Sequence, residues 1–288
     1  MNLGAHMSIE GGLPNALVRG RETGCSVVQL FLKNQRQWVG RPVPAEEVTE
    51  FKRLRAATGI ETAFAHATYL INLCSPVEAE WARSVDAFVD ELERAELLGL
   101  PFVVIHPGSH KGAGVRRGLA RLVRAIDALH ARTAGYRVTI ALENAAGCGN
   151  LLGGRAEELG AVLRRVRRPE RLAFCLDTCH LFAAGHDIRT AAGLDATLAR
   201  FDAAIGLERV VAWHLNDAKA ALGSGLDRHE HIGRGAIGRA AFGRLLRHPV
   251  VGRQPMVLET PKEDDWDRRN LRTLRRLRRA PAPRPSPA

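Results

Sequence analysis

The sequence predicts an α/β protein built as a (β/α)8 barrel. Eight short apolar runs rich in β-branched residues recur along the chain, and amphipathic helical patterns lie between them. Strands that alternate with helices pair in parallel through right-handed crossovers. Eight such units in 288 residues close most simply into a barrel. An open doubly wound sheet is the alternative, but no glycine-rich phosphate-binding fingerprint follows the first strand.

The predicted strands share short length, apolar composition and bounding turn residues. They span 2–6, 27–32, 61–66, 102–108, 138–144, 172–177, 210–215 and 255–260. The predicted helices share an apolar stripe at helical spacing. The clearest of them span 79–100, 116–133, 155–168 and 238–248. No linker separates these units, so we expect one catalytic barrel domain over residues 1–279.

The C-terminal segment, DRRNLRTLRRLRRAPAPRPSPA, is strongly basic. Its first half predicts a final helix, and the Pro- and Arg-containing remainder, 280–288, predicts a disordered tail. The whole chain carries 42 Lys and Arg against 31 Asp and Glu, a net charge of +11. This balance favours a polyanionic partner but does not determine the fold.

Composition also limits the location of the protein. No stretch approaches the roughly 20 apolar residues of a membrane span, so we expect no membrane association. The N-terminus, MNLGAHMSIEGG, lacks the pattern of a signal peptide. The five cysteines are scattered and odd in number, which fits a reduced cytoplasmic protein better than a disulfide framework.

Six of the predicted strands carry a metal-competent side chain at or near their end. These residues are His66, His106, Glu143, Asp177, His214 and Glu259. Because the carboxyl ends of barrel strands open on one face, the six groups are expected to converge there. Imidazole nitrogen and carboxylate oxygen are zinc ligands, and they also suit manganese or iron. The sequence therefore predicts a catalytic metal centre at the mouth of the barrel.

Three further residues extend this prediction. His180 follows Asp177 by three positions, and Asp227 and His229 lie in a glycine-rich segment after the seventh strand. Together His180, Asp227 and His229 could hold another ion. The alternative is a flexible turn with unrelated polar residues, because an Asp-x-His spacing alone is weakly specific.

Nine motifs of the chain match one known family. They are GAHMSIEGG (4–12), FLKNQRQW (31–38), HATYLINL (66–73), HPGSH (106–110), LENAAG (142–147), CLDTCHLFAAGHDIRT (175–190), WHLNDAK (213–219), DRHEHIGRGAIG (227–238) and LET (258–260). From about residue 2 to about residue 260 the chain closely resembles endonuclease IV, the family of metal-dependent apurinic/apyrimidinic (AP) endonucleases. The resemblance implies a TIM barrel of the xylose-isomerase-like kind.

The resemblance also implies three zinc ions and assigns their ligands, although Mn²⁺ or iron could replace zinc at one or more sites. His66, His106 and Glu143 would hold the first ion. Glu143, Asp177, His214 and Glu259 would hold the second. His180, Asp227 and His229 would hold the third.

The activity implied by the resemblance is DNA repair. The enzyme would hydrolyse the phosphodiester 5′ to an abasic site in double-stranded DNA, leaving a 3′-hydroxyl and a 5′-deoxyribose phosphate, and would trim blocked 3′ ends. Glu259 and Glu143 would be catalytic, and the protein is expected to act as a monomer. Arg36 and Tyr69 would contact DNA. Weaker contact candidates are Lys33, Asn34, Asn72, Asn216 and Lys219.

Two positions depart from the family pattern or lack a role. Ala67 stands where an acidic residue is expected after the first histidine ligand, so a supporting hydrogen bond could be lost there. Cys148 has no assigned role. Two other functions compete with the nuclease prediction: a sugar isomerase on the same barrel, and a DNA-binding module without catalysis. A third ion would have no place in the isomerase, and nine converging metal-competent groups would have no purpose in the binding module.

Overall fold

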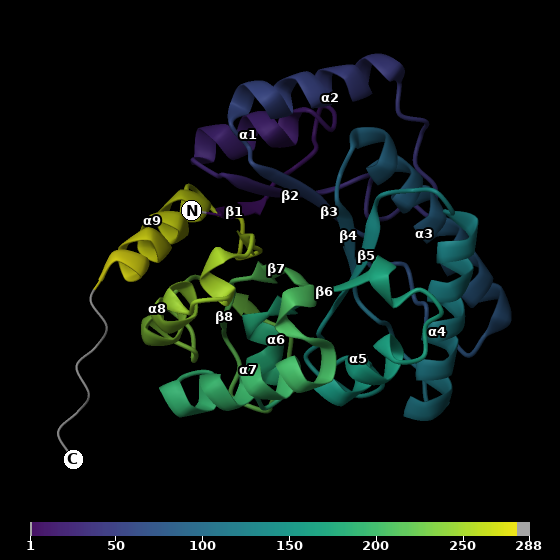
Figure 1. Cartoon of the computed structure of the whole chain (residues 1–288). Coiled ribbons are helices and arrows are strands. Elements are labelled where there is room, and N and C mark those ends of the chain that lie inside the picture. The colour runs from purple at the N-terminus through teal and green to yellow at the C-terminus, as the bar shows by residue number, and fades with distance from the viewer. Residues whose placement is uncertain (1, 281–288) are drawn as a thin grey trace.

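The computed structural model describes residues 2–280, and the predicted tail beyond residue 280 lies outside that range. Eight parallel strands close a barrel in the order β1-β10-β7-β6-β5-β4-β3-β2 (Figure 1). The strands are β1 (Leu3–His6), β2 (Val27–Phe31), β3 (Thr62–His66), β4 (Phe102–Ile105), β5 (Thr139–Glu143), β6 (Leu172–Asp177), β7 (Val210–His214) and β10 (Met256–Leu258). Each lies inside its predicted range, and the predicted (β/α)8 fold is confirmed.

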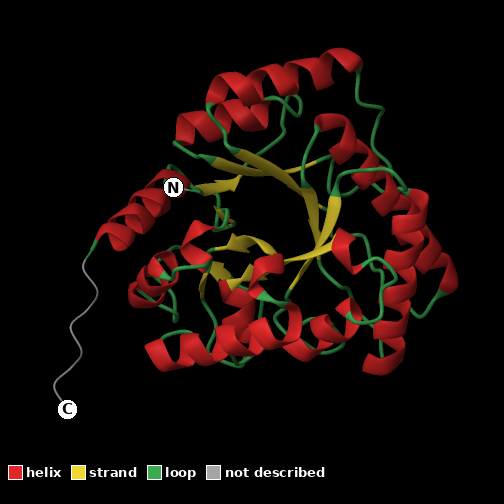
Figure 2. Cartoon of the chain, in the orientation of Figure 1, coloured by secondary structure: helices red, strands yellow, loops and turns green. Residues whose placement is uncertain are grey.

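Helices surround the barrel on its outer side (Figure 2). They are α1 (Asn15–Thr23), α2 (Ala45–Thr58), α3 (Glu78–Leu98), α4 (Val115–Arg132), α5 (Ala156–Leu163), α7 (Ala191–Ile205), α8 (Arg239–Arg247) and α9 (Trp266–Arg279). The predicted basic final helix is α9. The helix predicted over 155–168 ends at Leu163, before the 3₁₀ turn that starts at Pro169. Among the described residues, no helix has the length and apolar character needed to cross a membrane.

Two elements were not expected from the sequence. The short helix α6 (Thr178–Ala183) follows β6 directly, because the Asp177 side chain caps it by accepting a hydrogen bond from the backbone N–H of His180 at 3.0 Å. An antiparallel ribbon of β8 (Asp217–Ala218) and β9 (His229–Glu230) lies outside the barrel sheet. The segment predicted as a glycine-rich loop is therefore partly ordered as a ribbon.

The interior of the barrel is filled with small and aromatic apolar side chains. They are Val27, Phe64, Phe102, Val104, Ala141, Ala173, Cys175, Ala212 and Val257. The barrel is thus a packed core and not a pore. At Gly4 a Cβ would lie 1.5 Å from the backbone oxygen of Val27, so only glycine lets β1 approach β2 at this level.

A layer of polar residues lies above this apolar core. Side chains alternate between the two faces of a strand, so residues two positions apart face the same side. For each strand, one polar residue lies two positions after a residue that faces the barrel interior. We call these eight residues the polar ring: His6, Gln29, His66, His106, Glu143, Asp177, His214 and Glu259. The β6–β7 register places Asp177 directly beside His214. The fold thus brings one polar side chain from every strand to the same end of the barrel.

Candidate metal centre

The first group at the mouth joins three strand ends. Nε2 of His66 lies 3.1 Å from Glu143 Oε2, and Nε2 of His106 lies 3.6 Å from the same oxygen. His66 and Glu143 are buried. Nδ1 of His66 lies 2.7 Å from the backbone oxygen of Ala67, so a carbonyl orients this ring. The backbone of Ala67 thus contacts the ring of His66, although its side chain cannot do so.

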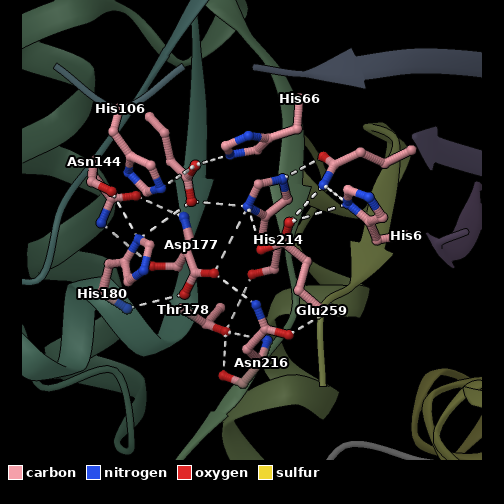
Figure 3. A network of polar contacts seen from close by, with 12 residues as sticks. His6, His66, His106, Asn144, Asp177, Thr178, His180, His214, Asn216 and Glu259 are labelled. Carbon is pink, nitrogen blue, oxygen red and sulfur yellow. Dashed lines mark hydrogen bonds and ion pairs between the residues drawn. The ribbon is translucent and has the colours of Figure 1, made fainter. Parts of the chain in front are cut away.

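The second group gathers around His214. Its Nδ1 lies 2.8 Å from Glu143 Oε1, 3.1 Å from Glu259 Oε2 and 3.8 Å from Asp177 Oδ2. The side chains of Glu143, Asp177 and His214 are almost completely buried, and that of Glu259 is 12% exposed. Glu143 belongs to both groups, because one of its oxygens faces His66 and the other faces His214 (Figure 3 shows the surrounding histidines).

The third group lies where α6 meets β9. Asp227 places Oδ2 3.2 Å from His180 Nε2 and Oδ1 3.1 Å from His229 Nε2. The other ring nitrogen of His229 lies 3.0 Å from the backbone oxygen of Glu259. His229 Nε2 is buried and has no hydrogen-bond partner among residues 2–280. Because Nδ1 faces the Glu259 carbonyl, Nε2 is the ring atom that an ion between His180 and Asp227 would meet.

Supporting residues that the sequence did not reveal hold these groups in place. Asn216 was a candidate DNA contact, but it is buried. Its amide donates to Asp177 Oδ2 at 2.7 Å, and its Oδ1 accepts from the backbone N–H of Glu259 at 2.8 Å (Figure 3). Asn144 Oδ1 accepts from the backbone N–H of Asp177 at 2.6 Å. Such partners fix the orientation of metal ligands.

Asp217 shapes the segment that carries the third group. This carboxylate is buried at the start of β8. It accepts hydrogen bonds from the backbone N–H groups of Ala218 at 2.9 Å, Gly233 at 2.8 Å and Ile237 at 2.9 Å. Hydrogen bonds to this one carboxylate therefore hold the segment between β8 and α8 in place. Asp227 and His229 lie within that segment.

The electrostatics of the mouth favour positive charge. Burial alone would raise the pKa of Glu143, but the imidazoles of His214 and His106 outweigh it and hold this pKa well below its ordinary value. Burial would lower the pKa of His229, yet the carboxylates of Asp177 and Asp227 raise it to about 9. The carboxylates therefore stay ionised and attract cations. At His106, burial prevails and lowers the pKa to about 4, so this ring is neutral and can donate a lone pair.

The donor set fits divalent cations. Groups of residues that could hold a metal ion, within residues 2–280, include the three sets His66–His106–Glu143, Glu143–Asp177–His214–Glu259 and His180–Asp227–His229. A fourth set joins Asp177 and His229 to Cys179. Burial raises the pKa of Cys179 to about 12, and its thiol lies 3.6 Å from the backbone oxygen of Arg228. The nitrogen and oxygen donors of the other sets are those of a zinc, manganese or iron site.

Known proteins of high similarity share this architecture. A family model described as a xylose isomerase-like TIM barrel matches residues 17–279. The probable endonuclease 4 of Chloroflexus aggregans is 46% identical over 281 residues, which cover 97% of this chain and 98% of that protein. The crystal structure of endonuclease IV from Thermus thermophilus matches with a TM-score of 0.85 and 35% identity, covering 96% of this chain and 98% of that chain. The chain belongs to the endonuclease IV family.

The barrel alone does not distinguish this family from sugar-converting enzymes. A D-tagatose 3-epimerase-like protein matches with a TM-score of 0.73 but only 19% identity, covering 96% of this chain and 97% of that chain. That likeness shows the shared fold alone. The endonuclease IV assignment rests on the much higher identity of the other relatives, and function must be derived from the site.

Tyr69 and Arg36 are the two main DNA-contact candidates in this endonuclease IV family member. Tyr69 lies at the mouth of the barrel. Its side chain is 62% exposed, and its ring centroid lies 5.7 Å from that of His66 and 6.1 Å from that of His106. It lines a cavity of about 360 Å³ together with His106 and Asn72. Arg36 is exposed in the segment after β2. Both positions are open to a large ligand.

The weaker DNA-contact candidates divide into exposed and structural residues. Asn34 and Lys219 are exposed, whereas Asn72 donates to the backbone oxygen of Ser109 at 3.0 Å. Lys33 is buried, and its Nζ lies 2.7 Å from Asp90 Oδ2 and 3.3 Å from Glu91 Oε1. Its ammonium therefore anchors the segment after β2 to α3 and cannot reach a DNA phosphate.

Proposed function

We propose that this protein is a DNA-repair AP endonuclease that cuts the phosphodiester 5′ to an abasic site. The reaction would use three divalent cations, for which zinc is the proposed metal. The products would be a 3′-hydroxyl and a 5′-deoxyribose phosphate, and the same site would trim blocked 3′ ends. The enzyme class, a phosphodiester hydrolase, is that of the endonuclease IV family. The observation that carries the proposal is the convergence of three metal-competent groups at one barrel mouth.

The ligand sets assign each residue a role. His66 and His106 would bind the first ion, Asp177, His214 and Glu259 the second, and Glu143 would bridge them. His180, Asp227 and His229 would bind the third. Bound dications of this kind generate a nucleophile from water at neutral pH and offset charge on phosphoryl oxygens. Manganese or iron would suit the same donors at one or more positions.

Glu259 and Glu143 are the proposed catalytic carboxylates. Burial would raise the pKa of Glu259, but the nearby imidazoles of His214 and His6 outweigh it and hold this pKa well below its ordinary value. Glu259 is therefore ionised at neutral pH and can accept a hydrogen bond from the attacking water. Its Oε1 is held by Gln29 at 2.5 Å, so its orientation is fixed before substrate binds.

Other features of the chain suit a DNA substrate. A net charge of +11 attracts the phosphate backbone. A scissile phosphate can reach buried groups only if the abasic nucleotide leaves the helix. The exposed ring of Tyr69 would fill the gap, and Arg36 would enter the base stack or hold a phosphate. All ligands come from one chain, which supports a monomer, and the five free cysteines support a cytoplasmic location.

A duplex oligonucleotide with one abasic site tests this function. We expect a single cut 5′ to the site, loss of cleavage after prolonged chelation, and recovery with added zinc. The variant His106→Ala should lose most activity, whereas His248→Ala, which changes a histidine after α8 that belongs to none of the candidate metal groups within residues 2–280, should not. A duplex with a 3′-phosphate end tests trimming. Absence of cleavage by the metal-loaded protein would contradict the proposal.

A further inference from the structure

We propose that Gln29 is a positioning residue that keeps a proton on Nε2 of His214 and leaves Nδ1 free for the second ion. This inference rests on the proposed metal centre. Gln29 is completely buried in β2, and it was absent from the predicted site. Its amide touches three members of the polar ring: Glu259 Oε1 at 2.5 Å, His6 Nδ1 at 2.8 Å and His214 Nε2 at 2.7 Å.

The three contacts leave one consistent arrangement of hydrogen atoms. A carboxylate only accepts hydrogen bonds, so the NH₂ group of Gln29 must face Glu259. Its oxygen then faces His214 and can only accept, which requires a proton on His214 Nε2. The opposite nitrogen, Nδ1, is the atom that lies 2.8 Å from Glu143 and 3.1 Å from Glu259. With Nε2 committed to Gln29, Nδ1 is the ring atom that can exchange its proton toward Glu143 for the second ion.

The second hydrogen of the same NH₂ group determines which ring nitrogen of His6 carries the proton. That hydrogen points to His6 Nδ1, which must accept, so the proton of a neutral His6 lies on Nε2. His6 Nε2 is buried and has no hydrogen-bond partner in the described part of the chain. The ring packs on Phe31 with centroids 4.3 Å apart. His6 and Gln29 thus form a chain of contacts that ends on Glu259 and His214 (Figure 3 shows the two histidines and Glu259).

A second glutamine of the barrel shows what a purely structural role looks like. Gln254 precedes β10 at the opposite end of the barrel. It donates to the backbone oxygens of Leu207 at 2.9 Å and Val210 at 2.7 Å, and it accepts from Trp213 Nε1 at 2.6 Å. Gln254 therefore also makes three hydrogen bonds, but none of them reaches a member of the polar ring. The two glutamines form a matched pair.

The test compares Gln29→Met with Gln254→Met, since methionine has a similar length and forms none of these hydrogen bonds. Zinc affinity is measured by competition with a chromophoric chelator, and zinc content by elemental analysis. Outer partners of metal ligands typically contribute 10–100-fold in affinity, so we expect Gln29→Met to lose about that factor for one ion. Gln254→Met should lose thermal stability but keep the zinc affinity of the wild type. Equal zinc affinity in both variants would overturn the inference.

A measurement on the unaltered protein covers the case in which Gln29→Met fails to fold. Long-range ¹H–¹⁵N correlation on zinc-loaded protein with ¹⁵N-labelled histidine reports which ring nitrogen carries the proton. We expect the proton of His214 on Nε2, and a proton on Nδ1 would overturn the inference. Wild-type protein that binds no zinc would overturn the proposed function and this inference together. Full zinc loading with the opposite proton position would overturn this inference alone.

Discussion

The apolar core of the barrel and the polar ring lie on the same eight strands or directly after them, two residues apart, yet they have opposite chemistry. Phe64 and Ala141 are buried and apolar, whereas His66 and Glu143, one inward-facing position further along, are buried and polar or ionised. The lower layer lowers the free energy of the folded state by removing apolar surface from water. The upper layer places several carboxylates close together, which is unfavourable without cations. The fold is thus stabilised in one layer, and function is located in the next.

The largest expected effect comes from breaking the polar ring at its shared member. Glu143→Gln preserves shape but removes the charge that joins the first and second groups. We expect cleavage of an abasic duplex to fall about 1,000-fold, as when a group that stabilises transition-state charge is lost. The metal-free protein should also lose some stability, because the low pKa of Glu143 shows that neighbouring imidazoles stabilise its ionised form in the folded state. Activity within about tenfold of the wild type would contradict a bridging role.

A substitution in the apolar layer should instead lower the stability of the fold and leave zinc binding unchanged. Phe64 packs against Phe102 with ring centroids 4.7 Å apart. Phe64→Ala should lower the free energy of unfolding by about 3–5 kcal/mol, as other large-to-small core substitutions do. Denaturant unfolding measures the loss, and elemental analysis at low temperature should find the wild-type zinc content. Loss of zinc from a fully folded variant would show that the two layers are not separable.

Lys33 tests whether the segment after β2 depends on a buried ion pair. Lys33→Met leaves the buried Glu91 without its cation, while Asp90 keeps Arg94 at 2.9 Å, so the free energy of unfolding should fall by about 3 kcal/mol. Lys111 pairs with Glu80 at 2.6 Å on the surface, with both side chains nearly half exposed. Lys111→Met should therefore cost less than about 1 kcal/mol. Similar costs for the two variants would argue against an anchoring role for Lys33.

The smallest expected effect concerns the exposed ring at the mouth. Tyr69→Ala should slow abasic cleavage about tenfold, because a stacking contact with a base contributes about 1–3 kcal/mol. Tyr69→Phe keeps the ring and should retain most activity, and neither variant should change zinc content. Equal losses in both variants would assign the effect to the hydroxyl and not to stacking.

The sequence predicted the strands well but only part of the polar ring. Apolar runs located all eight strands, and polar residues at or near strand ends indicated six members of the polar ring: His66, His106, Glu143, Asp177, His214 and Glu259. His6 and Gln29 were missed. Gln29 lies in the middle of a buried apolar strand, where sequence alone does not tell which alternate residues face inward. Once one inward residue is known, a step of two positions along each strand finds the whole ring.

The parts that the sequence could not predict depend on contacts between distant segments. The β8–β9 ribbon is shaped by the buried carboxylate of Asp217, which binds backbone groups up to Ile237. The role of Asn216 depends on its neighbours Asp177 and Glu259, which are far away in sequence. Lys33 could be recognised as structural only when α3 placed Asp90 and Glu91 beside it. Such partners become visible only in three dimensions.

The metal content of the purified protein tests the account most directly. Elemental analysis of wild-type protein saturated with zinc and freed of loosely bound metal should find three ions per chain, and the same sample should cut an abasic duplex. Folded protein that holds two ions or fewer under these conditions would contradict the account.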